Sequence, residues 1–189
     1  MGGLLLLLLW PRRPPKRSVL FLRCALNGPT YARVLDSLRR AKDSLFRYDP
    51  NSPIPPSARA HFLGLRYFPL DTSWRLFGRF EPLPKALPPI IGQVWLNLPG
   101  MEHCRAPTRL LVYGSREGRP FLAFWDSTAA LGQTYEGGRY VPIDTAEGQA
   151  CVDFNCAYFP YCAYDPAYLC LPYPPENRLC VRISAGERW

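Results

Sequence analysis

Hydrophobic and polar residues follow two different periods along the chain. Between Thr30 and Arg47 apolar residues recur about every 3.6 positions, which predicts one amphipathic helix. The sequence N-G-P-T at 27–30 is a start signal for this helix, and Y-D-P at 48–50 ends it. We expect the apolar face to contain Val34, Leu35, Leu38, Leu45 and Phe46, and the opposite face to contain mainly Arg33, Arg39, Arg40, Lys42 and Asp43.

From Leu65 onward the pattern changes to short apolar stretches separated by turn residues, which is typical of antiparallel β structure. The segment Gly114–Pro120 has the composition of a hairpin turn. Cys156–Pro175 is rich in proline and tyrosine, and we expect it to be a long loop packed over the sheet. The predicted strands are Trp74–Phe80, Ile90–Leu98, Thr108–Tyr113, Phe121–Trp125, Arg139–Ile143, Cys151–Phe154 and Leu179–Ile183.

These patterns together predict a mainly β fold. The expected architecture is an antiparallel sandwich or barrel-like sheet, with one amino-terminal helix and a long Pro/Tyr-rich carboxy-terminal loop. The chain has 189 residues, 48% of them hydrophobic, which suits a single domain over residues 30–189. Its 22 prolines exclude a helical bundle, and no apolar run has the ~20 residues of a membrane-spanning helix.

The net charge of +8 lies entirely at the amino-terminal end. Residues 1–48 contain ten basic and two acidic residues, whereas residues 49–189 contain 13 of each. Nucleic-acid binding needs an excess of basic residues that contact phosphates, and the body of the protein has no such excess. We therefore do not expect a nucleic-acid partner.

Residues 1–29 form a basic, leucine-rich extension. Leu4–Leu9 is a leucine run, and the basic cluster Pro11–Arg17 follows it. A secretory signal has its positive charge before the apolar stretch, so this order favours an organelle-directed or assembly-binding segment, with the mitochondrion as one destination. The alternatives are export, or a membrane anchor in which residues 1–26 make peripheral contact with the lipid surface. An unstructured tail is also compatible with the sequence.

Several motifs follow one another in the second half of the chain: F-L-A-F-W-D-S-T at 121–128, T-Y-E-G-G-R-Y at 134–140 and D-F-N-C-A-Y-F-P-Y-C-A-Y at 153–164. C-L-P-Y-P-P-E-N-R-L at 170–179 and I-S-A-G-E at 183–187 continue the series. In this order they resemble domain-of-unknown-function family 1684, which is found mainly in bacteria and archaea. The resemblance extends from about residue 37 to the end of the chain. It implies domain limits and shared clusters of residues, but no activity.

The candidate ligand-binding residues are the polar residues within and around these motifs. Arg139 follows a Gly-Gly pair that permits close approach of the backbone, and its planar guanidinium suits a carboxylate or phosphate. In a pocket, Asp126 or Asp153 would act as a base. The favoured interpretation is instead a buried ion pair of Arg139 with Asp126 or Asp153 that ties the loop to the sheet. The full set is Asp126, Thr128, Tyr135, Arg139, Asp153, Asn155, Glu176 and Asn177.

Seven cysteines are present, five of them in the last 39 residues. Zinc sites use C-x-x-C pairs, which these spacings do not contain, so we expect no metal and no cofactor. A disulfide between Cys162 and Cys170 would close the aromatic loop. The favoured interpretation of the cysteines, however, is that they are small buried thiols.

These observations favour a non-catalytic interaction or structural protein with protein partners, such as an accessory subunit of an organelle or membrane assembly. Only two histidines are present, and there is no G-x-S-x-G motif, so the sequence favours a non-enzyme. The alternative is a small-ligand-binding or hydrolytic domain with a pocket around Asp126, Arg139 and Asp153. The tyrosines of 158–173 form either a surface for a ligand or partner, or the internal packing of the loop.

Overall fold

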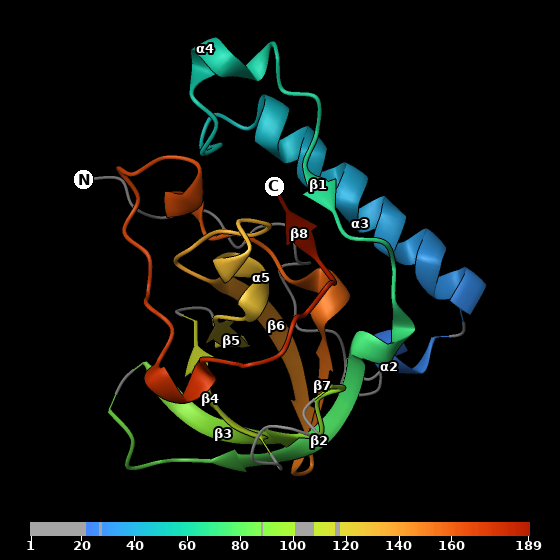
Figure 1. The fold of residues 1–189 in the computed structure, drawn as a ribbon, viewed down its shortest axis with the longest axis vertical. Coiled ribbons are helices and arrows are strands. Elements are labelled where there is room, and N and C mark those ends of the chain that lie inside the picture. Colours follow the sequence, from blue (N-terminus) through green and yellow to red (C-terminus); the bar gives the residue numbers. More distant parts are fainter. Residues whose placement is uncertain (1–21, 27, 88, 101–107, 116–117) are drawn as a thin grey trace.

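The computed structural model describes residues 22–26, 28–87, 89–100, 108–115 and 118–189. Six antiparallel strands form a closed barrel in the order β2-β3-β4-β5-β6-β7, and the β2–β7 pair closes it. This architecture confirms the mainly β prediction, and Figure 1 shows the barrel in the lower half of the molecule. The strands are β2 (Arg75–Pro82), β3 (Ile90–Leu96), β4 (Thr108–Gly114), β5 (Pro120–Phe124), β6 (Arg139–Ala146) and β7 (Gln149–Asp153).

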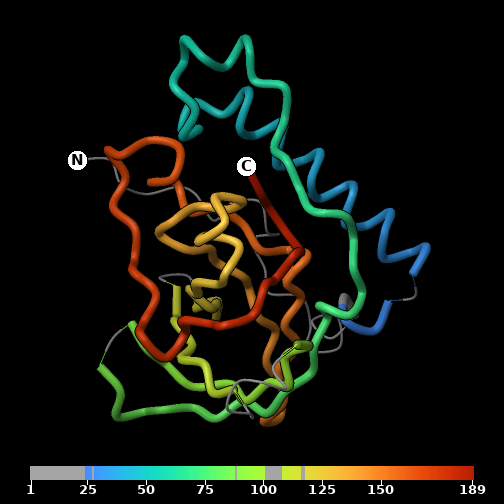
Figure 2. Tube along the Cα trace, in the orientation of Figure 1, coloured from blue at the N-terminus to red at the C-terminus, as the bar shows by residue number. Residues whose placement is uncertain are grey.

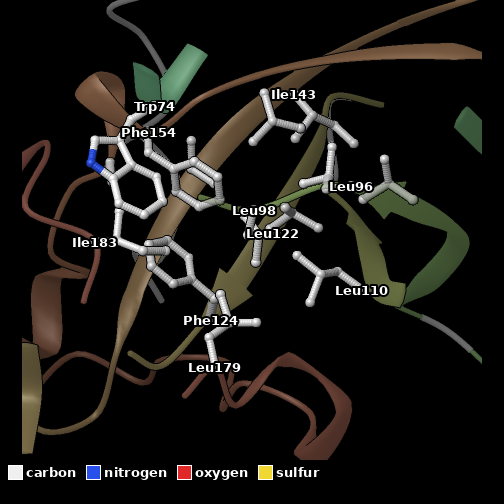
Figure 3. Packing of buried hydrophobic residues seen from close by; sticks show 14 of the residues in the cluster. Trp74, Leu96, Leu98, Leu110, Leu122, Phe124, Ile143, Phe154, Leu179 and Ile183 are labelled. Atoms are coloured by element: carbon white, nitrogen blue, oxygen red, sulfur yellow. The ribbon is translucent and has the colours of Figure 1, made fainter. Parts of the chain in front are cut away.

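Apolar side chains fill the inside of the barrel. Alternate residues of each strand point inward, as Val94 and Leu96 do from β3. Phe124 and Phe154 pack edge to face at the end of the barrel from which α5 and η2 leave (Figure 3). The interior is therefore a packed core, as is usual for a barrel of this size.

The predicted helix over 30–47 is present as α3 (Gly28–Tyr48), which runs diagonally past the end of the barrel at the upper right of Figure 1. Tyr31, Leu35 and Phe46 are its buried residues. Arg39 and Lys42 also face the barrel, so the expectation that they lie on the outer face is wrong. The physical reason is that the end of the barrel offers acceptors for both cations: Arg39 donates to the carbonyl of Asn155, and Lys42 pairs with the carboxylate of Glu187.

The expected last strand at Leu179–Ile183 is wrong: this segment has no regular structure. Its apolar residues alternate because Leu179, Val181 and Ile183 plug the end of the barrel. Their backbone groups pair with the turn that follows β5, since Leu179 N–H donates to Trp125 O and Ile183 N–H donates to Asp126 Oδ2. The alternation therefore indicated which of these residues are buried, and did not indicate that the segment is a β-strand.

The remaining elements are short. They comprise α4 (Pro56–Arg59), α5 (Ser127–Ala130) and a two-stranded sheet of β1 (Arg66–Tyr67) with β8 (Glu187–Arg188). The described residues also contain four 3-10 turns: η1 (Thr72–Trp74), η2 (Phe154–Cys156), η3 (Tyr161–Ala163) and η4 (Pro175–Asn177). The loop between η3 and η4 runs down the outside of the barrel, as the trace in Figure 2 shows.

Residues 22–26, which the sequence places in the extension, lie against the barrel. They include α2 (Leu22–Ala25), which contacts β2 and β7. A disulfide joins Cys24 to Cys151 of β7, and Leu26 O accepts a hydrogen bond from Arg75 Nη2 (3.1 Å). The part of the chain described before α3 is therefore attached to the barrel wall by a covalent bond.

Candidate functional site

Arg139 and Asp126 form a buried ion pair at the end of the barrel. The distance from Arg139 Nη2 to Asp126 Oδ1 is 2.8 Å, and both side chains are almost completely buried. Gly138 makes this approach possible: its φ is +91°, and a Cβ at this position would lie 2.5 Å from Phe124 O. Of the two acids considered for Arg139, the structure thus places Asp126 beside it.

The other bonds of the Arg139 guanidinium go to the carboxy-terminal segment. Nη1 donates to Ala185 O (2.5 Å) and Glu187 O (3.2 Å), and Nη2 donates to Ile183 O (2.9 Å). Burial lowers the pKa of Arg139, and the Asp126 carboxylate opposes this effect. The guanidinium therefore holds three carbonyl groups of the carboxy-terminal segment, and two of them, at Ile183 and Ala185, lie outside any strand.

Asp126 is also the N-cap of α5. Its Oδ2 accepts hydrogen bonds from Thr128 N (3.3 Å), Thr128 Oγ1 (2.8 Å) and Ile183 N (2.9 Å). Thr128 Oγ1 and Thr134 Oγ1 are 2.8 Å apart, which joins the first turn of α5 to the segment that follows the helix. Both oxygens of the carboxylate are thus engaged within the chain.

Asp153 belongs to a separate group of contacts. Its Oδ2 accepts from Tyr31 of α3 (2.7 Å) and from the Cys156 sulfhydryl (3.8 Å), and its Oδ1 accepts from Asn155 N (3.0 Å). The Asn155 side chain in turn pairs with both backbone groups of Asp71. These residues attach α3 and the segment before β2 to the end of β7, and do not extend the Arg139 cluster.

Asn177 bridges two strands that separate from each other. Strands β4 and β5 pair only between Tyr113 and Phe121 and between Gly114 and Pro120. Beyond that point Asn177 Oδ1 accepts from Leu111 N (2.7 Å), while its Nδ2 donates to Leu111 O and Ala123 O. The side chain thereby replaces the missing ladder bonds where the barrel opens.

The last two residues of the predicted set lie outside these clusters. Tyr135 OH donates to Cys162 Sγ (3.9 Å), and its ring contacts Trp189 edge to face. Glu176 is exposed at η4. The structure therefore distributes the eight residues among several separate groups of contacts.

Sequence reasoning missed the ion pair of Lys42 with Glu187, which joins α3 to β8. Glu187 Oε2 also accepts from Phe159 N (2.8 Å) and Tyr164 OH (3.1 Å), and burial next to this carboxylate raises the pKa of Tyr164. Glu187 lies in I-S-A-G-E, one of the motifs that carry the family resemblance, and this was the available signal. The position of Lys42 on a helix gave no indication of a partner 145 residues away.

The tyrosines of 158–173 pack internally. Tyr161 and Tyr164 contact Phe46 of α3 edge to face, and Tyr158 lies beneath the Lys42 ammonium. On the barrel side, Tyr140 OH donates to Leu171 O (2.6 Å). Of the two interpretations of these aromatic residues, this packing matches the structural one.

The interpretation of the cysteines as buried thiols is wrong for five of them. Disulfides join Cys24 to Cys151 and Cys162 to Cys170, and Cys180 is disulfide-bonded as well. Burial and covalent pairing are compatible, and the sequence spacing does not distinguish a buried thiol from a bonded one.

Within the described ranges, no group of three or more His, Cys, Asp or Glu could hold a metal ion. The helices described are also too short or too polar to cross a membrane.

The fold and these contacts define an antiparallel barrel whose strands close on themselves and whose interior is packed with apolar side chains. The end of the barrel from which η2 leaves is covered by α3 and the carboxy-terminal segment. A family model for a protein of unknown function (DUF1684) matches residues 60–188. The chain belongs to this family, which confirms the resemblance inferred from its motifs.

A solved structure supports the same architecture. The chain is similar to an uncharacterized protein of Haloarcula marismortui, which was solved by solution NMR. The two sequences are 27% identical, and the two structures superpose with a TM-score of 0.66. The alignment covers 85% of this chain and 95% of that chain. A search of curated proteins gives no match.

Proposed function

We propose that this protein is a non-catalytic interaction protein that serves as an accessory subunit of a larger assembly. The observation that carries the proposal is the bonding of Arg139 and Asp126, the charged pair most suited to a ligand. Their hydrogen bonds go to Thr128 and to backbone groups of residues 183–187, and both side chains are buried. A group with this bonding stabilises a fold and is not positioned to receive a substrate.

Two further features support the proposal. The barrel interior is filled by its own side chains, so it offers no lumen for a small ligand. The other acid of the candidate pocket, Asp153, accepts from Tyr31 and Asn155. Each candidate base is thus bonded to groups of the chain itself.

The disulfides bear on the compartment. Disulfides persist in oxidising environments and are rare where thiols are kept reduced. Five of the six described cysteines are disulfide-bonded. We therefore propose that the mature protein resides on the oxidising side of a membrane. This favours export, membrane anchoring or an oxidising organelle compartment over a reducing matrix.

The function is tested by native mass spectrometry of the protein isolated from its own source. We expect a complex of fixed stoichiometry with other proteins, and the same complex from an Arg139→Lys variant that is folded but less stable. A monomer carrying a small bound mass that Arg139→Lys loses would overturn the proposal and favour a ligand pocket.

The compartment is tested on the same material. Alkylation under denaturing, non-reducing conditions should leave Cys24, Cys151, Cys162, Cys170 and Cys180 unlabelled. Labelling of all five would show that the protein matures in a reducing compartment.

A further inference from the structure

The segment from Pro166 to Pro172 exposes an apolar ridge on the outside of the barrel. We define the apolar ridge as the exposed residues Pro166, Ala167, Leu169, Leu171 and Pro172. Ala167, Leu169 and Leu171 point to solvent, whereas Tyr168 and Cys170 between them are half-buried. Pro166 to Tyr168 form a turn in which Tyr168 N donates to Asp165 O (3.1 Å), and half-buried and exposed residues alternate only from Tyr168 to Leu171.

The ridge is held rigidly by contacts on its inner side. The Cys162–Cys170 disulfide closes the loop, and Tyr168 packs edge to face on Tyr161. An Asx turn fixes the start of the segment, since Ala167 N donates to Asp165 Oδ1 (2.9 Å). At its end, the hydroxyls of Tyr140 and Tyr113 donate to Leu171 O (2.6 Å) and Pro172 O (3.0 Å).

Rigidity distinguishes these leucines from leucines scattered over a surface, which need no explanation. A preorganised segment loses little conformational entropy when it binds, so its apolar contacts convert more fully into affinity. The segment also contains no charged residue between Asp165 and Glu176. Uncharged, apolar and rigid surface is typical of the centre of a protein interface.

We propose that the apolar ridge is the docking surface for a partner protein. The partner presents an uncharged, apolar groove that receives Leu169 and Leu171 as side chains two residues apart. Asp165 and Glu176 bracket the ridge, so basic residues at the two ends of the partner's groove complement it. This inference rests on the proposed function and names the surface through which it is exercised.

The first experiment locates the contact. The full chain is produced in its source cells with a photoreactive amino acid in place of Leu169. A control protein carries the same photoreactive amino acid in place of Leu63, which lies in the connection between α4 and β1. The two positions are matched, with exposed fractions of 101% and 96%. We expect the version at 169 to crosslink to one protein, at an apolar segment flanked by basic residues. Crosslinks to lipid, to a second copy of this chain, or to nothing would overturn the docking surface.

The second experiment measures affinity with the partner so identified, in purified form. Replacing both leucines, Leu169→Asp and Leu171→Asp, should weaken binding by about 100-fold or more, because each buried leucine contributes on the order of tenfold to a hundredfold. Leu63→Asp should leave Kd within about twofold. The melting temperature of each variant shows that it is folded.

The outcomes separate the two proposals. If the wild-type chain joins an assembly and the double variant binds its partner as tightly, the docking surface is wrong and the proposed function stands. If the wild-type chain is monomeric in its source, the proposed function fails, and the docking surface fails with it.

Discussion

Arg139 illustrates how one buried charge organises a segment that has no secondary structure. The carboxy-terminal segment leaves η4 and crosses the barrel end without a strand partner for its carbonyl groups at 183 and 185. Arg139 supplies donors to both, and Asp126 accepts the N–H of Ile183. An irregular segment can be buried only if its polar groups are paired, so this ion pair is a condition for closing the barrel.

Arg139→Lys is therefore expected to reduce the free energy of unfolding by about 3 kcal/mol, because an ammonium cannot replace a planar guanidinium that contacts several oxygens. Equilibrium unfolding in guanidinium chloride measures the change. Arg182→Lys is the control, since Arg182 is exposed on the same segment and should change stability by less than about 0.5 kcal/mol. Equal effects of the two substitutions would show that the buried bonds contribute nothing.

Glu187 gives a second prediction at a single position. Glu187→Gln keeps the shape of the side chain but removes the charge that faces Lys42, and we expect a loss of about 2–4 kcal/mol. Adding Lys42→Met removes the unpaired ammonium, so the double variant should be more stable than Glu187→Gln alone. Additive losses in this double-mutant cycle would mean that the two side chains do not interact.

At the scale of elements, the two disulfides whose cysteines both lie among the described residues join segments of very different separation. Cys24 and Cys151 are 127 residues apart, whereas Cys162 and Cys170 are eight apart. Cross-linking distant residues removes more entropy from the unfolded chain, by about 5 kcal/mol for the long loop and about 2.5 kcal/mol for the short one. The long link also holds α2 on β2 and β7, although α2 has only four residues.

Replacing both cysteines of each pair tests this difference. The double variant Cys24→Ala and Cys151→Ala should lower stability more than Cys162→Ala and Cys170→Ala, measured by thermal unfolding without reductant. The short pair is the internal control for loss of a sulfur bond. A larger loss from the short pair would show that local packing of the aromatic loop outweighs chain entropy.

Several elements could be predicted from the sequence because their signals are local. The 3.6 period of α3 and the alternation in β3 are set by neighbours within a few residues. Leu179–Ile183 alternates in the same way, yet the choice between a strand and a plug depends on whether Arg139 and Asp126 pair with its backbone. Such pairing joins residues 44 or more positions apart, and no local pattern encodes it.

In the candidate site, too, features set by neighbouring residues could be predicted, whereas pairings between distant residues could not. Arg139 was a candidate because of its residue type and its position next to Gly137-Gly138, with Asp126 or Asp153 as its expected partner, and the structure brings Arg139 and Asp126 together. Asp153 is of the same chemical type, but its partner is Tyr31 of α3. Its place depends on how a helix packs on a barrel, which residue type alone does not determine.

At the scale of the whole molecule, tyrosine hydroxyls join segments that are far apart in the chain: Tyr31 donates to Asp153, Tyr164 to Glu187 and Tyr140 to Leu171 O. Burial raises the pKa of Tyr140 to about 12, above the ordinary value near 10. Burial next to Asp153 raises the pKa of Tyr31 further, and burial next to Glu187 does the same for Tyr164. The neutral phenols therefore stabilise the fold fully below pH 10, and this contribution is lost as the pH rises above 10.

The free energy of unfolding should accordingly fall steeply as the pH rises above 10. Each fully buried phenol, such as Tyr31, lowers the free energy of unfolding by about 1.4 kcal/mol per pH unit above 10. A pH jump followed by tyrosinate absorbance should show part of the phenols ionising at once, and the buried ones only as the chain unfolds. Tyr31→Phe should reduce the slope of stability against pH, whereas Tyr48→Phe, at an exposed position, should leave it unchanged. An unchanged slope in Tyr31→Phe would mean that α3 leaves the barrel before Tyr31 ionises, so that its contacts with Asp153 do not contribute to the cooperative fold.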